Sequence, residues 1–556
     1  MTDYQGYETD DDTHKTSIHN EWKTVVAKKK LLRGITLTIG MFFDGTGNNR
    51  ENSASRQLKF NQCSAPLQGV NLKDGQSCED FYKYISKETV SNGSYRGYYS
   101  NIHWLNQLYK PDQSLSEEQT TAQIKTYISG IGTAIDESDS LLGMATGSSL
   151  LAVFEGVVTK TDEAIKGITE EILAFMKRND TQDFCIAKIQ FDVFGFSRGA
   201  AAARHFANRV MEQDAAIAKA ISVGLKGDFY DGKPSGEVRF LGIFDTVAAI
   251  GGIDNFFDIN GRNNPRVKLE LRPSVAKKVF QITAANEYRY NFSLNSIKGM
   301  WPELALPGAH SDIGGGYNPV ESPLQENENL FLSCPRFEIV SDDTAEINTQ
   351  VYRKAEQARE QLLMLPIIRL LIPYCKITTK TYSVGVVSSE SRLDGMIKKQ
   401  VGAAVFLERK AIPNDWSKVS LRVMLDAAQE AGVLFNEIQE NDDNLSLPAE
   451  LTSLCIKAVA QGKAIRCGQE PQLFTADELL IIGRYIHCSS NWNVESDRNL
   501  WVDPKSGGIF ISRFGPKGNK AFVYPNKPSD GWVRSVWYMD DQQKLQDGET
   551  RKTAAV

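Results

Sequence analysis

The sequence predicts an α/β protein with a mostly parallel sheet and helices on both faces. Short apolar runs of strand composition alternate with longer segments of helical spacing between about residues 34 and 330. Several of these runs end in a polar residue beside a turn. The length of 556 residues predicts two domains, or one large domain with an insertion, and the 41% apolar fraction is typical of a globular protein.

The expected elements follow one another along this segment. ITLTIGMFF (residues 35–43) predicts a buried strand that ends in the turn-rich DGTGNN, and a long polar loop then extends from Arg50 to about Gly97. Residues 102–109 and 141–178 have helical spacing. Further strand-like runs are KTYISGIGT, FCIAKIQFDVF, EVRFLGIFD and WPELALPGAH.

Composition divides the chain into three expected regions. Residues 1–33 form a polar leader, residues 34–330 form the α/β domain, and residues 331–556 form a mainly helical region. Within the last region, residues 344–376 predict one or two helices, and residues 417–463 predict more helices that are interrupted at NDDN.

Charge and targeting signals exclude several classes of protein. A net charge of −6 and a pI near 5.8 give no reason to expect nucleic-acid binding. The first residues lack the basic start and apolar core of a signal peptide, and no uncharged apolar run is long enough for a spanning helix. The eight cysteines are scattered singly, which predicts free thiols in the cytoplasm, with a Cys63–Cys78 pair as the minor alternative.

The pattern Gly-x-Ser-x-Gly occurs once, in KIQFDVFGFSRGAAAARHFANRV (residues 188–210), with Ser197 at its centre. A hydrophobic strand precedes it and a segment of high helix propensity follows, as in the nucleophile elbow of α/β-hydrolases. Gly195 and Gly199 are then required, because a Cβ atom at either position would clash with the crossing strand and helix. A structural Gly/Ser turn is the alternative interpretation.

A nucleophilic serine needs a base, and four of the six histidines are poor candidates. His14 and His19 lie in the polar leader, and His103 precedes the serine, against the hydrolase order of serine, acid and histidine. His205 follows Ser197 by eight residues on one helix, about 12 Å along its axis.

The remaining candidates are His310 and His487. His310 lies in the glycine-rich LPGAHSDIGGGY, directly after an apolar run, where a loop at a strand end would carry a base. His487 lies in a continuous apolar segment and fits a core or supporting role. We therefore favour His310 and keep His487 as the alternative.

The acid that orients the base is expected at a strand end after the serine. Asp245, in FLGIFDTV, fits this position. Asp312 is the alternative, although an aspartate so close to His310 is more often a turn-stabilising residue. Asp192 lies within the strand before the elbow, so we expect it to be too far from the carboxyl end of the sheet to reach the base.

Two backbone amides are expected to bind the oxyanion of the reaction. One belongs to Arg198, directly after the nucleophile. The other is expected from the GTGNN loop, at Gly45 or Thr46, and Asp44 is expected to brace that loop or the base.

Motifs of other chemistries are incomplete or missing in the sequence. Phe-Phe-Asp-Gly-Thr is similar to the end of a haloacid-dehalogenase phosphatase strand, but the nucleophilic aspartate of that family would stand at position 42, which is Phe42. The chain has no zinc-ligand spacing and no phosphate-binding loop, so no cofactor is required. Calcium at Asp44 or Asp312 stays open, because oxygen ligands leave little spacing signature.

Several motifs together resemble one known family. In order within about residues 35–320 they are FFDGTGNN, SNIHWL, YISGIGT, FDVFGFSRGAAAARHFA, FLGIFDTVAAIGG, NEYRYNF and LALPGAHSDIGGGY. They resemble the α/β-hydrolase domain shared by the first class of type VI secretion lipase effectors. On the matching positions, the resemblance implies that Ser197 is the nucleophile, Asp245 the acid and His310 the base.

The resemblance implies a phospholipase of A1 or A2 type that releases fatty acids from membrane glycerophospholipids. It also implies an antibacterial toxin, made in the cytoplasm without a signal peptide and injected into the periplasm of a competitor. A spike protein and an immunity protein are the expected partners, and we expect a monomer. A serine esterase or thioesterase with another acyl substrate, and a non-enzymatic secretion adaptor, are the alternatives.

Access to a lipid suggests roles for two segments outside the motifs. LLMLPIIRLLIPY (residues 362–374) is either a lid with Arg369 near headgroups or an interior helix kinked by Pro366 and Pro373, and we favour the interior helix. The four C-terminal tryptophans fit packing between segments better than contact with a membrane; they are Trp492, Trp501, Trp532 and Trp537.

Overall fold

The computed structural model describes residues 7–8, 31–45, 48, 53, 97–130, 152–226, 230, 232–248, 267–320, 327–386, 398–439, 441–493, 500–502, 509–511 and 526–539. Nearly all of the expected polar leader and polar loop, with Cys63 and Cys78, lie outside these residues. Within them, no helix combines the length and the apolar character needed to cross a bilayer.

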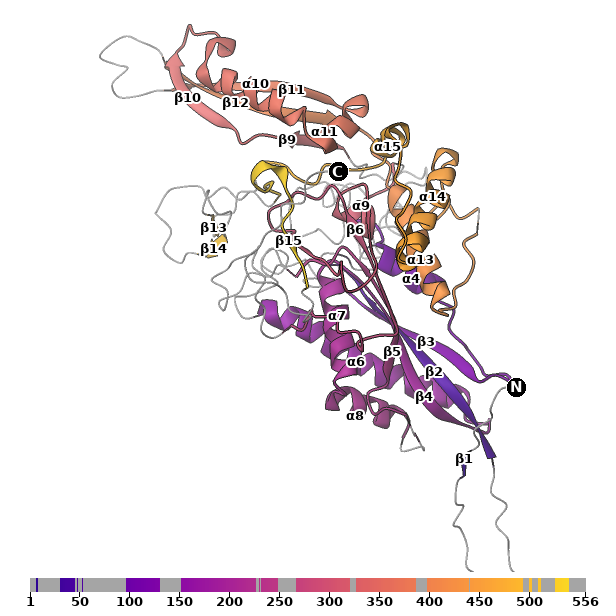
Figure 1. The fold of residues 1–556 in the computed structure, drawn as a ribbon. Coiled ribbons are helices and arrows are strands. Elements are labelled where there is room, and N and C mark those ends of the chain that lie inside the picture. Colours follow the sequence, from indigo (N-terminus) through magenta and orange to yellow (C-terminus); the bar gives the residue numbers. More distant parts are fainter. Residues whose placement is uncertain are drawn as a thin grey trace, which may run out of the picture.

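A seven-stranded sheet forms the centre of the molecule (Figure 1). Its strand order is β1-β2-β4-β5-β6-β8, and β3 pairs with β2. All pairs are parallel except that of β1 with β2, which confirms the predicted α/β class. The strands are β1 (Tyr7–Glu8), β2 (Leu31–Phe43), β3 (Thr121–Ile128), β4 (Phe184–Phe196), β5 (Glu237–Phe244), β6 (Lys278–Ala284) and β8 (Glu303–Leu306).

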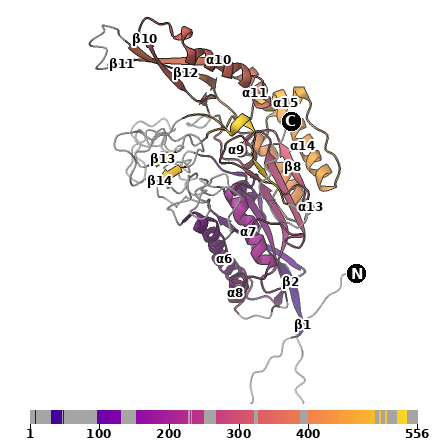
Figure 2. The ribbon, with the colours of Figure 1, turned by 60° about the vertical axis from the view of Figure 1, so that its left-hand side comes forward.

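Helices cover both faces of this sheet, because side chains alternate between its faces along each strand. In β4, Phe191 and Val193 join one apolar cluster, whereas Phe194 and Phe196 join another. The first cluster is covered by α6 (Ala152–Arg178), α7 (Arg198–Met211) and α8 (Ala215–Gly224). The second is covered by α4 (Asn101–Leu108), α9 (His310–Gly314), α13 (Trp416–Glu430) and α14 (Ala449–Arg466), as Figures 1 and 2 show.

A second, antiparallel sheet lies at the top of the molecule in Figure 1. It consists of β9 (Glu328–Phe331), β10 (Arg336–Ser341), β11 (Lys376–Val386) and β12 (Lys398–Arg409), and α10 (Gln350–Leu362) packs against it. The sequence prediction missed this sheet in a region expected to be mainly helical. The predicted helices are present as α10 and α11 (Pro366–Leu371) within residues 344–376, and as α13 and α14 on either side of NDDN.

The segment LLMLPIIRLLIPY is buried on one side only, because Met364, Ile372 and Tyr374 are exposed. Ile367, Ile368 and Leu371 of α11 are buried in the second apolar cluster, while Arg369 is exposed. Pro366 begins α11 at its first turn, where proline is tolerated, and so does not kink it. A 3-10 turn, η4 (Ile372–Tyr374), then ends the segment.

The remaining elements are short. β7 (Leu294–Asn295) pairs in parallel with β15 (Val536–Trp537), which joins the end of the chain to the α/β domain. β13 (Leu500–Val502) and β14 (Ile509–Ile511) form an antiparallel pair. The others are α15 (Ala476–Gly483), η3 (Glu346–Asn348) and η5 (Asp530–Trp532).

Candidate active site

The polar residues predicted at strand ends gather at one edge of the central sheet. Asp44 follows β2, Ser197 follows β4, Asp245 follows β5, and His310 begins α9 shortly after β8. Because these strands are parallel, their carboxyl ends lie at the same edge, where open α/β sheets build their sites.

Ser197 occupies a sharp turn between β4 and α7. Its backbone has φ 59° and ψ −126°, and its carbonyl accepts from Ala200 N in the first turn of α7. Ser197 N donates to Phe244 O at 3.0 Å, and Val247 N donates to Ser197 O at 3.3 Å. These bonds hold the serine backbone against the chain on either side of Asp245.

The two glycines of the elbow are required for the reason predicted from the sequence. A Cβ atom at Gly195 would lie 2.6 Å from Gly199 O. One at Gly199 would lie 2.3 Å from Asp44 O and 2.4 Å from Phe43 O. The contacts are with main-chain atoms, so only glycine allows the strand and helix to approach this closely.

The structure brings Asp245 and His310 together beside this elbow. His310 Nδ1 lies 2.5 Å from Asp245 Oδ2. The imidazole centroid lies 4.6 Å from the ring of Phe196, the residue before Ser197, and 4.9 Å from that of Phe292. Since Nδ1 faces the carboxylate, Nε2 is the ring atom left to serve the serine.

Three charged residues that were not predicted from the sequence lie around this pair. Arg534 donates to both oxygens of Asp245, at 2.7 and 2.8 Å. Glu287 accepts from His310 N at 3.2 Å and pairs with Arg289 at 2.9 Å. Glu287 and Arg289 belong to the motif NEYRYNF, which was a signal for them, whereas nothing in the local sequence marks Arg534.

Burial and neighbouring charges set the ionisation of these groups. Burial opposes the negative charge of Asp245, but Arg534 and His310 outweigh it and hold the pKa of that carboxyl well below its usual range. Burial likewise opposes ionisation of Glu287, yet Arg289 lowers its pKa to about 2. Burial lowers the pKa of His310 although Asp245 opposes the shift, so the imidazole is neutral near pH 7.

The alternative pair, Asp312 and His487, forms a separate contact. His487 Nδ1 lies 2.6 Å from Asp312 Oδ1, and the Tyr317 ring stacks on His487 at 3.7 Å. Asp312 Oδ2 accepts from Ala309 N and His487 N, both at 2.8 Å. Asp312 therefore fixes the start of α9, and His487 fixes Asp312, which leaves His310 as the histidine paired with Asp245.

The other histidines in the described residues have partners of their own. His103 stacks on Tyr99 at 4.1 Å. His205 Nδ1 accepts from Lys268 N at 3.1 Å, and burial, with Arg209 and Lys268 nearby, lowers the pKa of His205 to about 4. His14 and His19 lie outside the described residues.

Of the predicted oxyanion donors, Arg198 lies where expected, whereas the amide of Gly45 has another partner. Arg198 is the first residue of α7, directly after the serine, as expected. Gly45 N donates to Asp44 Oδ1 at 2.7 Å, so this amide is directed at the carboxylate, against our expectation. The carboxylate of Asp44 is buried and therefore needs hydrogen-bond donors, of which Gly45 N is one. It also accepts hydrogen bonds from Ser100 Oγ and Tyr127 OH, both at 2.6 Å. Thr46 lies outside the described residues.

The two aspartates considered for calcium, Asp44 and Asp312, are both hydrogen-bonded within the protein, and calcium binding at either stays a hypothesis. N–H and O–H groups of the protein already point at the carboxylate oxygens of Asp44 and Asp312. In the part of the chain that the structure describes, no cluster of three histidine, cysteine or acidic residues is arranged to hold a metal. Asp44 braces its loop, which is one of the two roles predicted for it.

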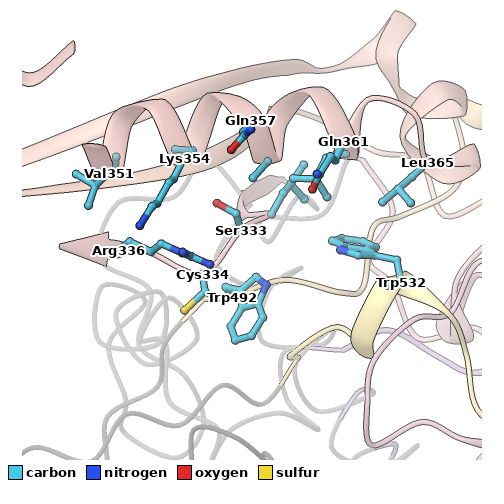
Figure 3. Close-up of a pocket in the computed structure, with 16 residues that line it drawn as sticks. Ser333, Cys334, Arg336, Val351, Lys354, Gln357, Gln361, Leu365, Trp492 and Trp532 are labelled. Atoms are coloured by element: carbon cyan, nitrogen blue, oxygen red, sulfur yellow. The ribbon is translucent and has the colours of Figure 1, made fainter. Parts of the chain in front are cut away.

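A cavity of about 770 Å³ lies between α10 and the end of the chain (Figure 3). Lys354, Gln357 and Gln361 of α10 face Trp492 and Trp532 across it. Neither Ser197 nor the Asp245–His310 pair lines this cavity. Trp532 also packs against Tyr288, with ring centroids 5.9 Å apart, and the preference for packing at the other tryptophans stays a prediction.

Comparison with known proteins identifies the family. A family model for the catalytic domain of Tle1-like phospholipase effectors of type VI secretion matches residues 225–333. A solved structure of the Tle1 effector bound to the VgrG spike from the type VI secretion system is 71% identical, with a TM-score of 0.79, over 96% of this chain and 100% of that chain. The chain belongs to the Tle1-like phospholipase effectors. The resemblance seen in the motifs is confirmed.

Further comparisons add little to this assignment. An uncharacterized protein from Pseudomonas aeruginosa is 18% identical over 81% of this chain and 53% of that chain, with a TM-score of 0.33, which carries no argument about fold or function. No curated protein sequence matches the chain. As a Tle1-like effector, the protein is a lipolytic hydrolase delivered by type VI secretion.

Proposed function

We propose that this Tle1-like effector is a serine-dependent phospholipase A with Ser197, Asp245 and His310 as its catalytic triad. One observation carries the proposal: the 2.5 Å contact between His310 Nδ1 and Asp245 Oδ2 lies beside the turn that holds Ser197. Membership of the family supports the substrate class, and this geometry supports the triad.

In the first half of the reaction, Ser197 Oγ attacks the acyl carbonyl of a glycerophospholipid. His310 Nε2 accepts the hydroxyl proton while Asp245 stabilises the imidazolium through Nδ1–H. The amide of Arg198 and the N-terminus of α7 stabilise the oxyanion, and a second amide is expected from Thr46. The carbon–oxygen bond to the glycerol breaks, and the lysophospholipid alkoxide takes the proton from His310.

In the second half, a water molecule replaces the lysophospholipid. His310 removes one proton from the water as its oxygen attacks the acyl–Ser197 carbonyl. The tetrahedral intermediate collapses, the fatty acid leaves, and the proton returns to Ser197 Oγ. No step passes through a metal ion, so we expect the reaction to be insensitive to chelation.

Hydrolysis of phospholipids that carry separate fluorescent acyl groups at sn-1 and sn-2 tests this proposal. We expect Ser197→Ala and His310→Ala each to lower the rate by about 10⁶-fold, because the triad acts as a unit. His487→Ala is the matched control, since His487 is also buried against an aspartate; we expect a loss of at most about 100-fold, because it acts only through α9.

The outcomes separate the competing functions. Release of fatty acid by Ser197→Ala at the wild-type rate contradicts the serine mechanism. Complete loss of activity in a folded His487→Ala variant would assign the base to His487 instead of His310. Hydrolysis of small esters or thioesters without phospholipid hydrolysis supports the esterase alternative, inactivity on every ester supports the adaptor, and loss of activity in EDTA reopens the calcium hypothesis.

We further propose that the chain docks as a monomer on the VgrG spike and acts in the periplasm of the target cell. Identity of 71% to an effector bound to VgrG supports the docking. We expect the purified chain to retain VgrG in a pull-down, and to be toxic when exported to the periplasm but not when kept in the cytoplasm. Exported Ser197→Ala should be harmless, and an immunity protein should protect cells that carry the active form.

A further inference from the structure

The end of the chain returns to the catalytic edge of the sheet as a strap formed by residues 526–539. Tyr290 N donates to Lys527 O and Ser529 N donates to Tyr288 O, both at 2.8 Å. Farther along, β15 of the strap pairs in parallel with β7. In Figure 1 the strap is the yellow segment that carries β15 beside β6. It therefore follows the loop after β6 and passes next to the proposed acid.

Arg534 of this strap pairs with the acid through both of its terminal nitrogens. Its Nη1 donates to Asp245 Oδ1 at 2.7 Å and its Nη2 donates to Oδ2 at 2.8 Å. Nε donates to Phe292 O at 2.8 Å, and Nη1 also reaches Ala284 O at 3.2 Å. Arg534 is 6% exposed, so the guanidinium is held in one orientation by groups from three segments.

The carboxylate of Asp245 is thereby fixed on all sides. Oδ1 accepts from Arg534 and from Ala284 N at 2.9 Å, and Oδ2 accepts from Arg534 while it faces His310 Nδ1. A forked guanidinium–carboxylate pair restricts rotation of the carboxylate more than a single bond does. The oxygen that orients the imidazole therefore has one position.

We propose that Arg534 is a positioning residue of the triad: it locks the Asp245 carboxylate toward His310 and offsets its negative charge, which keeps the imidazole a neutral base. The proposal rests on the triad assigned above and goes beyond it, because it makes the strap a part of the active site. Arg534 acts through Asp245 and does not touch the reacting atoms.

The charges around His310 give the proposal a measurable consequence. Asp245 contacts the imidazole and Glu287 accepts from the backbone N–H of His310, and two guanidiniums pair with these carboxylates, Arg534 and Arg289. The other near neighbours are the rings of Phe196 and Phe292, which carry no charge. Removing Arg534 takes one positive charge away from this group of charges, so we expect the imidazolium to be stabilised and the pKa of His310 to rise.

The test compares Arg534→Gln and Arg534→Lys in the full-length protein. For Arg534→Gln we expect the acid limb of the kcat–pH profile to move up by about one pH unit. We also expect kcat to fall by about 100-fold at pH 8. Arg534→Lys keeps the positive charge but loses the two-nitrogen pairing with Asp245. We therefore expect kcat to fall while the acid limb of the kcat–pH profile stays in place. NMR titration of ¹³C-labelled histidines reports the pKa of His310 directly, without relying on catalysis.

Arg204→Gln is the matched control for the loss of a buried arginine. Arg204 is fully buried and donates to the carbonyls of Leu269 and Asn295, but it does not contact Asp245. The control should therefore leave the His310 titration unchanged, whatever it does to stability. An unchanged His310 titration and acid limb in Arg534→Gln overturns the proposal. Failure of the triad itself shows separately, as lipid release by Ser197→Ala.

Discussion

At the scale of single residues, two proposed catalytic groups have unusual backbone conformations. Ser197 has φ 59° and Asp245 has φ 42°, both in the left-handed region that non-glycine residues seldom adopt. Each costs about 1–3 kcal/mol, and such residues persist only where the surroundings over-determine them. Here the backbone hydrogen bonds of Ser197 to Phe244 and Val247, and that of Asp245 N to Ile282 O, hold the strained turns.

Gly199 allows a prediction about stability. We expect Gly199→Ala to lower the free energy of unfolding by at least about 3 kcal/mol, because the new methyl group meets two main-chain carbonyls that have little freedom to move. Urea unfolding followed by circular dichroism measures the change. Activity should fall with it, since α7 would be pushed away from the end of β2.

Gly385→Ala is the control for this substitution. Gly385 lies in β11, is exposed, and has nothing within 4 Å of the position that a Cβ atom would take. The free energy of unfolding of the Gly385→Ala variant should differ from that of the wild type by no more than about 0.5 kcal/mol. Equal stability of Gly199→Ala and Gly385→Ala would contradict the packing argument at the elbow.

At the scale of elements, the local sequence pattern predicted the two segments that carry Ser197 and His310. The strand–turn–helix around Ser197 and the loop with His310 are marked by glycine spacing and apolar runs, and both lie where predicted. β6 and the sheet of β9–β12 were missed. β11 mixes threonine, lysine and tyrosine with few apolar residues, because only part of this sheet is buried, so no clear periodicity marks it.

Arg534 was missed for another reason. It contacts Asp245 across 289 residues of sequence, and no spacing rule connects the two. A single arginine in a polar segment is ordinarily a solvated side chain. Only the pairing of β15 with β7 and the path of the strap bring it to the acid.

The helix that carries His310 depends on an element from the third region of the chain. α9 has only five residues, too few to be stable alone. Trp416 Nε1 of α13 donates to Pro307 O at 2.6 Å, just before α9. Ser420 Oγ, also of α13, donates to Ile313 O at 2.5 Å. The position of the proposed base is therefore set from both sides by a helix more than 100 residues away in sequence.

At the scale of the whole molecule, the expected boundary near residue 330 is not a break in packing. The second apolar cluster joins Phe194, Phe240 and Phe280 of the central sheet to Val423 and Met424 of α13. One face of the parallel sheet is thus covered by helices from beyond the boundary. The α/β region and the helices that follow it share a core.

This shared core predicts that residues 34–330 do not fold alone. The fragment would expose one apolar face of its sheet to water, so we expect it to aggregate or to lack a cooperative unfolding transition. Co-expression with residues 331–556 should restore a soluble complex that resists proteolysis. A soluble 34–330 fragment with a sharp thermal transition would contradict the prediction.

The strap also ties activity to the order in which the protein is made. Ser197, Asp245 and His310 leave the ribosome well before Arg534, which follows His310 by 224 positions (534 − 310). A nascent chain that has already exposed these three residues still lacks the group that locks the acid. On the role proposed for Arg534, the active site is complete only after the strap has been translated and has docked.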